Sequence, residues 1–465
     1  MSVTPPAYGP PMPSKTKTAK TVHRCSECGC EAPRWLGRCP ECDAWGTLAE
    51  VLPPSGDLRV AATGPVPIGE VDAHAAHPAP TGIGELDRVL HGGVVPGSVT
   101  LLAGEPGMGK STLLLQALGH LSAHGTRCLL VTAEESCAQV RLRAERVGAV
   151  HPNLLVVAET SLPHVLAHAD QSAPGVLAVD SIQTVVDPDL PGAPGSVTQV
   201  RDGAYRLVQH AKEHARATVL VGHVTKEGTL AGPRVLEHVV DTVLSFDGDR
   251  GHSLRALHAL KHRFGGTDEV GLFEMTERGL VDVPDASARF LVDRRPGVPG
   301  SAVAAVLEGA RPILVEVQAL AMRTGAPMPR RSAAGMESGR LAMLLAVLQS
   351  RAGVPSTNAD VYASVAGGLR ITERGLDLAL ALAVAGAQLA QATTRDTLAI
   401  GELGLGGEVR SVPQLDRRLA EAARLGFRRA VIPKATKPVT RVDGMDLVEV
   451  SSVRDALAEG LLPAG

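Results

Sequence analysis

A glycine-rich stretch followed by lysine and serine carries the strongest chemical signal in the sequence. It matches the pattern G-x-x-x-x-G-K-[ST] of phosphate-binding loops. The residues that form it are Gly104, Glu105, Pro106, Gly107, Met108, Gly109, Lys110 and Ser111. In such loops backbone N–H groups and the following helix N-terminus face phosphate oxygens. We therefore expect ATP binding, with Lys110 on the β- and γ-phosphates and Ser111 on Mg²⁺.

Acidic residues follow two apolar segments and could complete a hydrolytic site. Residues 175–180 end in Asp180, and residues 127–132 are followed by Glu134 and Glu135. Because the carboxyl ends of parallel strands meet at one sheet edge, these acids are expected beside the loop. We predict that Asp180 supports Mg²⁺ and that one glutamate polarises the attacking water. Taken singly, each acid also fits a solvated strand end or a helix cap.

A third apolar segment, 217–221, leads into Gly222, His223, Val224, Thr225 and Lys226. A polar residue at this place could sense the γ-phosphate and pass its state to the following loop. We assign the sensor role to Thr225. His223 fits an ordinary packing residue equally well, and spacing alone does not separate these two interpretations.

Five of the seven cysteines lie within eighteen residues. Cys25 and Cys28 form one CxxC pair, and Cys39 and Cys42 form a second, ten residues further on. Two such pairs can surround one Zn²⁺ with four thiolates. A pair of disulfides or free thiols is the alternative, but without a secretory signal disulfides are disfavoured. Four thiolates leave no position for a substrate, so the predicted zinc site is structural, and Cys30 is expected to be a bystander.

The elements that position these residues follow from the alternation of patterns. From Thr81 to Asp285 short aliphatic runs alternate with helical patterns, which predicts a βαβ arrangement and an α/β fold. A turn-rich segment near 294–300 precedes a second α/β block. The expected organisation is a disordered basic tail (1–24), a zinc finger (25–45), a linker (46–80), an ATPase domain (81–285) and a C-terminal domain (290–465).

Composition restricts the class of protein. The chain has 465 residues, 44% of them hydrophobic and 20% charged, with a net charge of −3. These values argue against global disorder. No apolar run approaches the roughly 18 residues needed to span a bilayer, and the first twenty residues contain no apolar signal core. We expect a cytoplasmic protein without membrane contact. The four basic residues between Lys15 and Arg24 suit a solvated tail better than a nucleic-acid-binding arm.

The four-cysteine finger, the phosphate loop and the run Lys261-His262-Arg263-Phe264-Gly265 together resemble the RadA (Sms) family of bacterial DNA repair proteins. Further matching stretches are 84–90, 131–136, 180–184, 222–226, 233–241 and 365–370. The resemblance implies a RecA-like ATPase core, a C-terminal domain shaped like the Lon protease domain, and a hexameric ring around DNA. It also implies a DNA-stimulated ATPase that acts on recombination intermediates and drives branch migration alongside RecA, on single-stranded and branched DNA.

The resemblance also implies roles for single residues. Glu134 aligns with the glutamate that activates water, which favours it over Glu135. Lys261 and Arg263 are expected to reach a nucleotide in the neighbouring subunit and to supply positive charge during phosphoryl transfer. The chain departs from the family pattern at His262, where the family usually has Asn, and at Ala133, where it usually has Gly.

The C-terminal domain suggests a rival function, an ATP-dependent protease of the Lon type. Lon proteolysis needs a serine nucleophile and a lysine base. The aligned serine position falls at Leu376 or Asp377, and the aligned lysine position falls at Asp416. We therefore expect no peptidase activity. A third hypothesis is a nucleotide switch without motor action that assembles repair partners.

Two groups of basic residues are candidates for DNA contact. Lys226 and Arg234 flank the loop after the predicted sensor strand. The second group is a local cationic stretch formed by Arg323, Arg330, Arg331 and Arg340. Both groups are equally compatible with solvated surface. With so few aromatic residues, DNA binding is expected to rest on the phosphate backbone and to weaken with salt.

Overall fold

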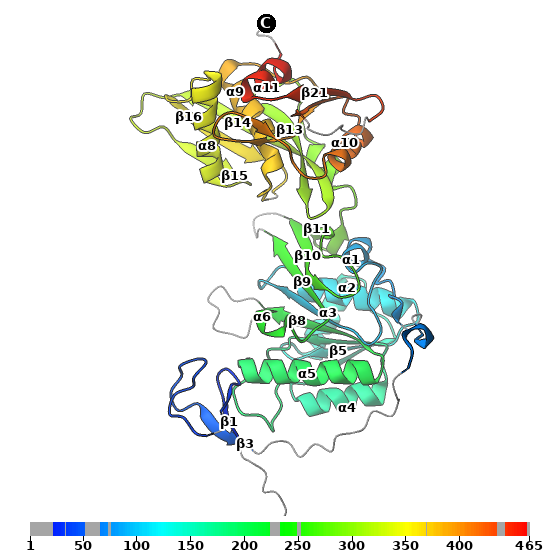
Figure 1. The fold of residues 1–465 in the computed structure, drawn as a ribbon. Helices are drawn as coiled ribbons and strands as arrows, with labels where there is room; N and C mark the ends of the chain where they lie inside the picture. Colours follow the sequence, from blue (N-terminus) through cyan, green and yellow to red (C-terminus); the bar gives the residue numbers. More distant parts are fainter. Residues whose placement is uncertain are drawn as a thin grey trace, which may run out of the picture.

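The computed structural model describes residues 22–32, 34–51, 66–72, 76–223, 233–248, 253–368, 370–434 and 442–462. Two α/β domains lie one above the other in Figure 1, and a small N-terminal ribbon lies beside one end of the lower, central domain. Within the described residues, no helix combines the length and the apolar character that crossing a bilayer requires.

The N-terminal ribbon is a three-stranded antiparallel sheet in the order β2-β1-β3. Its strands are β1 (Val22–Cys25), β2 (Glu31–Ala32) and β3 (Leu48–Val51). The sheet therefore extends beyond the predicted range 25–45 on both sides. Its buried core contains Cys25, Ala32, Cys39 and Leu48, which is too little apolar surface to stabilise a domain alone.

The central domain is built on a nine-stranded mixed sheet in the order β12-β11-β10-β9-β4-β8-β7-β5-β6. Strands β4 to β9 run parallel, as the alternating pattern predicts, and β10 to β12 extend one edge in antiparallel fashion. The strands are β4 (Val99–Gly104), β5 (Cys128–Thr132), β6 (Leu154–Ala158), β7 (Val176–Asp180), β8 (Ala217–His223), β9 (Thr242–Gly248), β10 (Leu254–His262), β11 (Val270–Thr276) and β12 (Gly279–Asp282).

Helices cover both faces of this sheet, which is why its inner strands are apolar on both sides. One core lies under α2 (Lys110–Ala123) and α3 (Cys137–Arg146), and the other lies under α4 (Leu162–Ser172) and α5 (Val197–Glu213). Two short helices, α1 (Gly84–Val89) and α6 (Pro233–Leu236), complete the domain. The ribbon touches α5, where the Thr198 hydroxyl donates to the Ser26 carbonyl over 3.3 Å.

The C-terminal domain packs helices against two small sheets, ordered β13-β14-β16-β15 and β17-β20-β21, with a hairpin β18-β19. Its strands are β13 (Ser301–Glu308), β14 (Arg311–Arg323), β15 (Arg331–Ala334), β16 (Ala359–Val365), β17 (Thr397–Ala399), β18 (Glu402–Leu403), β19 (Val409–Arg410), β20 (Arg429–Pro433) and β21 (Asp446–Val450). Its helices are α7 (Ala286–Leu291), α8 (Ser338–Val347), α9 (Asp377–Leu389), α10 (Leu415–Arg424) and α11 (Val453–Gly460). Short single-turn helices cover Leu348–Ala352 and Arg374–Leu376 in this domain. Another covers Ile68–Glu70, between the ribbon and the central domain.

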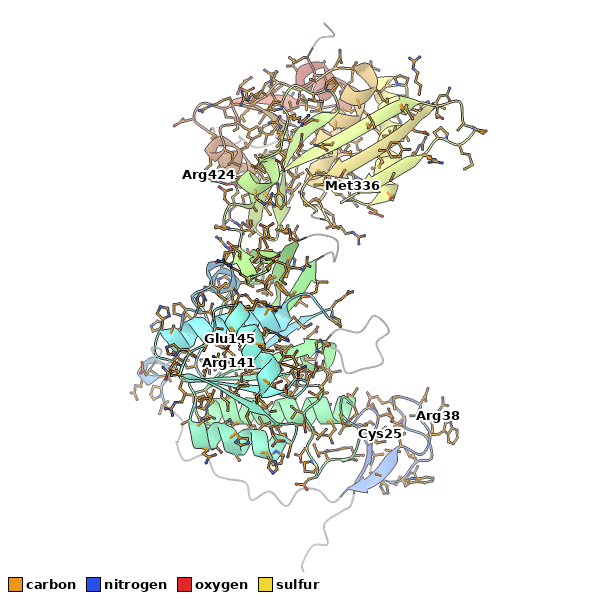
Figure 2. All side chains as sticks on the ribbon, turned by 180° about the vertical axis from the view of Figure 1, so that it is seen from behind. Cys25, Arg38, Arg141, Glu145, Met336 and Arg424 are labelled. Carbon is orange, nitrogen blue, oxygen red and sulfur yellow. The ribbon has the colours of Figure 1, made fainter. Side chains whose placement is uncertain are left out.

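A buried ion pair joins the two large domains. Glu85 of α1 is 2% exposed and accepts hydrogen bonds from the Leu272 backbone N–H (2.9 Å) and from Arg311 Nη1 of β14 (2.6 Å). Arg311 also donates to the Val283 and Pro284 carbonyls of the connecting segment. Apolar residues of both domains also belong to one continuous core. Figure 2 labels Arg424, which pairs with Asp285, on the C-terminal domain close to the connection between the two large domains.

Replacing Arg311 by Ala is expected to lower the free energy of unfolding by about 3–5 kcal/mol, because the buried Glu85 carboxylate then lacks its partner. Urea unfolding measures this loss. The matched control is Arg374→Ala, which removes an exposed ion pair with Glu402 and should cost less than about 1 kcal/mol. Equal losses in the two variants would show that the pair between the domains does not stabilise them.

Candidate nucleotide site and metal centre

The phosphate loop connects the end of β4 to the start of α2, the context in which such loops bind phosphate. Gly104 and Gly109 have backbone φ angles of 155° and 105°. A Cβ atom on Gly104 would lie 2.6 Å from the Phe246 carbonyl oxygen, and one on Gly109 would lie 2.6 Å from Met275 Cε. Both positions therefore require glycine, and the loop backbone stays close to the sheet.

Lys110 lies folded into this loop. Its Nζ donates to the carbonyl oxygens of Gly104 (2.8 Å) and Glu105 (2.9 Å), and the residue is buried. Burial lowers the pKa of the Lys110 ammonium, while the nearby carboxylates of Asp180 and Glu134 act in the opposite direction. The ammonium thus sits within the loop, next to the carboxylates that the sequence predicted beside it.

The strand register brings the predicted residues to one sheet edge. Gly104 pairs with His223 across β4 and β8, and Thr132 pairs with Asp180 across β5 and β7. Burial raises the pKa of the Asp180 carboxyl, while the nearby Ser111 side chain acts in the opposite direction. Ser111 and Asp180, the two residues predicted to support Mg²⁺, therefore lie close together.

The two adjacent glutamates point in different directions. Glu134 Oε1 accepts a hydrogen bond from the Ser181 hydroxyl and lies 3.3 Å from His223 Nε2. Glu135 forms an ion pair with Arg143 of α3, whose N-terminus is capped by Ser136. Glu134 is thus held by residues that follow β7 and end β8, whereas Glu135 is held by α3. Sequence reasoning did not single out Ser181, although it directly follows Asp180, and it left His223 undecided.

Lys261 and Arg263 lie at the opposite end of the sheet. Lys261 Nζ donates to the carbonyls of Glu237 (2.6 Å) and Val240 (2.7 Å), and Arg263 Nη1 donates to Asp241 Oδ1 (3.0 Å). Burial, followed by the charge of Arg263, lowers the pKa of Lys261.

The strand register measures the separation from the phosphate loop. His262 pairs with Thr242, and Thr242 pairs with Thr100 near the start of β4. The phosphate loop follows Gly104 at the other end of the same strand, four residues or about 13 Å away at about 3.3 Å per residue. These two cations are therefore remote from the phosphate loop of their own chain.

The unusual His262 is integrated into the packing. Its Nδ1 lies 2.9 Å from Thr242 Oγ1, and its ring stacks on His91 with centroids 5.3 Å apart. The Phe264 ring meets it edge-on. Burial, followed by the charge of His91, lowers the pKa of His262. Like the usual Asn, this residue offers a hydrogen-bonding side chain, here to a threonine hydroxyl.

The structure describes some of the sensor and DNA-contact candidates but not all of them. Thr225 and Lys226 lie outside the described residues, and Arg234 belongs to α6 but its side chain is not described. Arg323 ends β14, and Arg330 and Arg331 lead into β15, all in the C-terminal domain rather than at the nucleotide edge. Arg340 does not belong to an exposed cationic stretch, contrary to the prediction, because it faces inward and pairs with Asp377.

The positions that would carry a Lon-type catalytic pair hold other chemistry. Leu376 is buried, and Asp377 begins α9 as a buried carboxylate bound by Arg340 and by the Leu403 backbone N–H over 3.1 Å. Asp416 lies in the first turn of α10. These positions therefore present a paired acid and a second acid, with neither a hydroxyl nor an amine.

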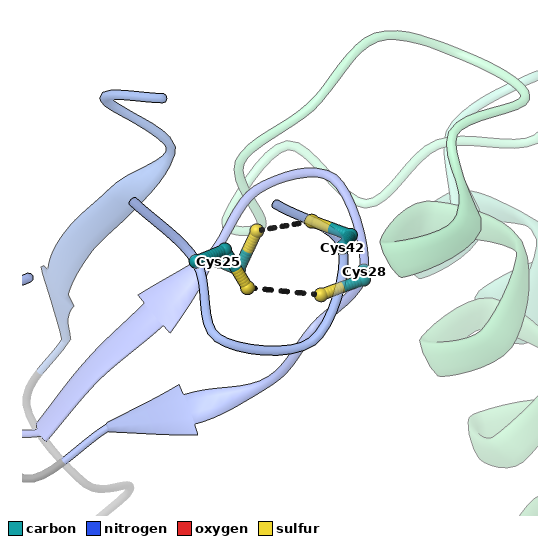
Figure 3. Close-up of side chains that lie close together, drawn as sticks. Cys25, Cys28 and Cys42 are labelled. Carbon is teal, nitrogen blue, oxygen red and sulfur yellow. Dashed lines mark hydrogen bonds between the residues drawn. The ribbon is translucent and has the colours of Figure 1, made fainter. Parts of the chain in front are cut away.

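The four predicted cysteine ligands converge in the ribbon. The sulfurs of Cys25, Cys28, Cys39 and Cys42 all lie within 4.8 Å of one another. Figure 3 shows this cluster, in which the Cys25 and Cys42 sulfurs are 3.6 Å apart and the Cys28 and Cys39 sulfurs are 3.5 Å apart. Thiolates bound tetrahedrally to Zn²⁺ at about 2.3 Å stand about 3.8 Å apart, so the set fits zinc. Cys30 is not part of this group.

Comparison with known proteins agrees with this organisation. A family model described as KaiC, an ATPase, matches residues 79–155, and a rubredoxin metal-binding domain of the zinc-ribbon type matches residues 23–50. A model of subunit ChlI of Mg-chelatase matches residues 346–436. The predicted α/β fold, with a RecA-like ATPase domain, a small four-cysteine zinc finger and a Lon-like C-terminal domain, is confirmed.

Full-length relatives cover nearly the whole chain. The DNA repair protein RadA of Mycolicibacterium smegmatis is 46% identical over 94% of this chain and 96% of its own length. The proteins of the same name from Pseudomonas aeruginosa and Bacillus subtilis are 46% and 43% identical, over 94% and 95% of this chain and 98% and 99% of their own lengths. At this identity and coverage, the chain belongs to the RadA family of DNA repair proteins.

Proposed function

We propose that the protein is a DNA-dependent ATPase that processes recombination intermediates during DNA repair, as a cytoplasmic ring that drives branch migration together with RecA. Family membership supports the repair role. The observation that carries the mechanism is the position of Lys261 and Arg263, at the far end of β4 from their own phosphate loop. Cations placed there serve a nucleotide held by another subunit, so hydrolysis requires assembly.

The residues of the chain divide the work of ATP cleavage. The loop backbone and Lys110 bind the β- and γ-phosphates, and Ser111 and Asp180 would hold Mg²⁺. When bound there, the ion would supply positive charge to the phosphate oxygens. Glu134, oriented by Ser181 and His223, accepts a proton from the attacking water. Lys261 and Arg263 of the adjacent subunit stabilise the charge of the transferring group.

The test is ATP turnover by the full chain with and without single-stranded DNA, followed by a branch-migration assay with RecA on three-strand intermediates. We expect DNA to stimulate turnover and ATP to be required for strand exchange beyond a homologous junction. Turnover that ignores DNA, combined with no binding to branched DNA, would refute the motor. A nucleotide switch would instead keep repair intact in a Lys110→Ala strain that cannot turn ATP over.

Peptidase activity is not part of this proposal. The buried ion pair of Asp377 with Arg340 occupies the place of a nucleophile, and Asp416 occupies the place of a base. Incubation with unfolded casein and ATP is expected to leave the casein uncleaved. The C-terminal domain serves as scaffold for the ring, and Arg323, Arg330 and Arg331 offer charge for the DNA backbone, as Lys226 and Arg234 do near the sensor residue Thr225.

Zinc is proposed to stabilise the ribbon, because its four-residue core is too small to fold unaided. Replacing Cys39 by Ser should reduce the zinc content from about one ion per chain to near zero and should expose the ribbon to trypsin at Arg34 and Arg38. Elemental analysis and limited proteolysis measure both effects. Cys30→Ser is the matched control and should retain the metal. Full zinc content in the Cys39→Ser protein would exclude the four-thiolate site.

A further inference from the structure

The side chains of Lys261, His262 and Arg263 all form hydrogen bonds to one turn of the chain. This receiving turn, residues 237–242, connects α6 to β9. Lys261 donates to its Glu237 and Val240 carbonyls, His262 is hydrogen-bonded to Thr242, and Arg263 pairs with Asp241. The run thus does not project freely from β10 but is fixed to the start of the neighbouring strand.

Asp241 is the member of this turn with the most contacts. Its Oδ1 accepts from Arg263 Nη1 and its Oδ2 accepts from the Val99 backbone N–H, each over 3.0 Å. Its own N–H donates to the Val99 carbonyl over 3.0 Å, and its carbonyl accepts from the Arg263 N–H over 3.2 Å. One buried residue therefore ties Arg263, by side chain and backbone, to the first residue of β4.

Asp241 is buried and Arg263 is exposed, which suits a role of Asp241 in positioning the Arg263 side chain. The Asp241 side chain is 6% exposed, whereas the Arg263 side chain is 52% exposed. The carboxylate binds Nη1 of the guanidinium from inside the protein, and about half of the Arg263 side chain stays open to a group outside. Because the guanidinium is planar and rigid, holding Nη1 restricts where its other donors can point. A long side chain held in this way loses little further freedom when it meets its target.

We propose that Asp241 is a positioning residue that preorganises Arg263 for the nucleotide of the adjacent subunit. This inference rests on the proposed role of Arg263 in phosphoryl transfer between subunits. Asp241 itself is not placed to contact a nucleotide, because its side chain is buried and its two carboxylate oxygens bind Arg263 and the Val99 backbone N–H. Its effect on a nucleotide of the adjacent subunit is therefore expected to pass through Arg263.

The first test is a double-mutant cycle on DNA-stimulated ATP turnover. Asp241→Asn, which keeps the size of the side chain, is expected to lower kcat about a hundredfold with KM for ATP unchanged, the effect of misplacing a catalytic group by about 1 Å. In an Arg263→Ala background the same change should alter kcat less than about twofold. The matched control is Asp187→Asn, a buried carboxylate paired with Arg206, which should leave kcat unchanged.

The second test separates Arg263 from the Val99 contact. The Asp241→Asn chain retains its phosphate loop, and a Lys110→Ala chain retains Asp241 and Arg263. Mixing the two chains should restore turnover if Asp241 acts through Arg263 in the neighbouring subunit. If Asp241 instead supported its own phosphate loop through β4, the mixture would stay inactive, which would overturn the proposal.

The outcomes also distinguish a failure of the proposed function from a failure of the positioning role of Asp241. No loss of turnover in Arg263→Ala would refute the proposed function, and with it the premise. A large loss in Arg263→Ala combined with additive effects of Asp241→Asn would refute only the positioning role. If Asp241→Asn fails to fold, Asp241→Glu, which keeps the charge and shifts it by one methylene, carries the same cycle, and additivity there overturns the inference equally.

Discussion

Replacing Glu134 by Gln is expected to lower ATP turnover by about 10²–10⁴-fold while ATP still binds. The reason is geometric. Glu134 shares the sheet edge with Asp180 and Lys110, and its Oε1 is held by the Ser181 hydroxyl next to His223. Glutamine preserves the shape and the hydrogen bond but cannot accept the proton of the attacking water. Single-turnover hydrolysis of radiolabelled ATP measures the chemical step, and filter binding measures ATP affinity.

The neighbouring residue provides the control within the same loop. Glu135 forms an ion pair with Arg143 on α3, so Glu135→Gln removes a structural contact and no catalytic one. We expect turnover within about threefold of the original protein, because partly exposed ion pairs contribute little. If Glu135→Gln were inactive and Glu134→Gln active, the assignment of the two carboxylates would be reversed.

The nucleotide edge could be predicted from the sequence because it obeys local rules. A phosphate loop has a fixed spacing, and apolar strands that end in acids meet at one edge whenever the sheet is parallel. The structure accordingly brings Ser111, Asp180 and Glu134 together. Spacing alone did not separate the two glutamates, and the family resemblance was needed to favour Glu134, because their contacts depend on Ser181 and Arg143, which approach from different elements.

Features that depend on distant pairing escaped prediction. In the sequence, strands β10 to β12 look like further apolar runs. Only their pairing shows that they join the edge of the sheet as antiparallel strands. Arg340 appeared to belong to a charged surface, but α9 supplies the buried Asp377 that turns it inward. In the ribbon, by contrast, the metal ligands follow directly from two CxxC pairs, while the pairing of Val22–Cys25 with Leu48–Val51 does not.

Replacing Arg263 by Ala is expected to lower DNA-stimulated turnover by about 10³–10⁵-fold, the loss that follows removal of a cation from the transferring phosphoryl group. Lys261→Ala should act in the same direction. ATP binding should persist in both variants, because each cation lies at the far end of β4 from its own phosphate loop. Steady-state turnover and filter binding measure the two properties, and cells with either variant should fail to survive DNA damage.

Mixing experiments decide whether the cation acts between subunits. An Arg263→Ala chain keeps its phosphate loop, and a Lys110→Ala chain keeps its Arg263, so each inactive chain holds what the other lacks. In a ring with head-to-tail interfaces, random mixing in equal amounts makes about one interface in four complete, so turnover should recover to about a quarter of the original value. A mixture without recovery would show that Arg263 acts on the nucleotide bound by its own subunit. That result would conflict with its anchoring at the amino end of β4, where Asp241 ties it to Val99.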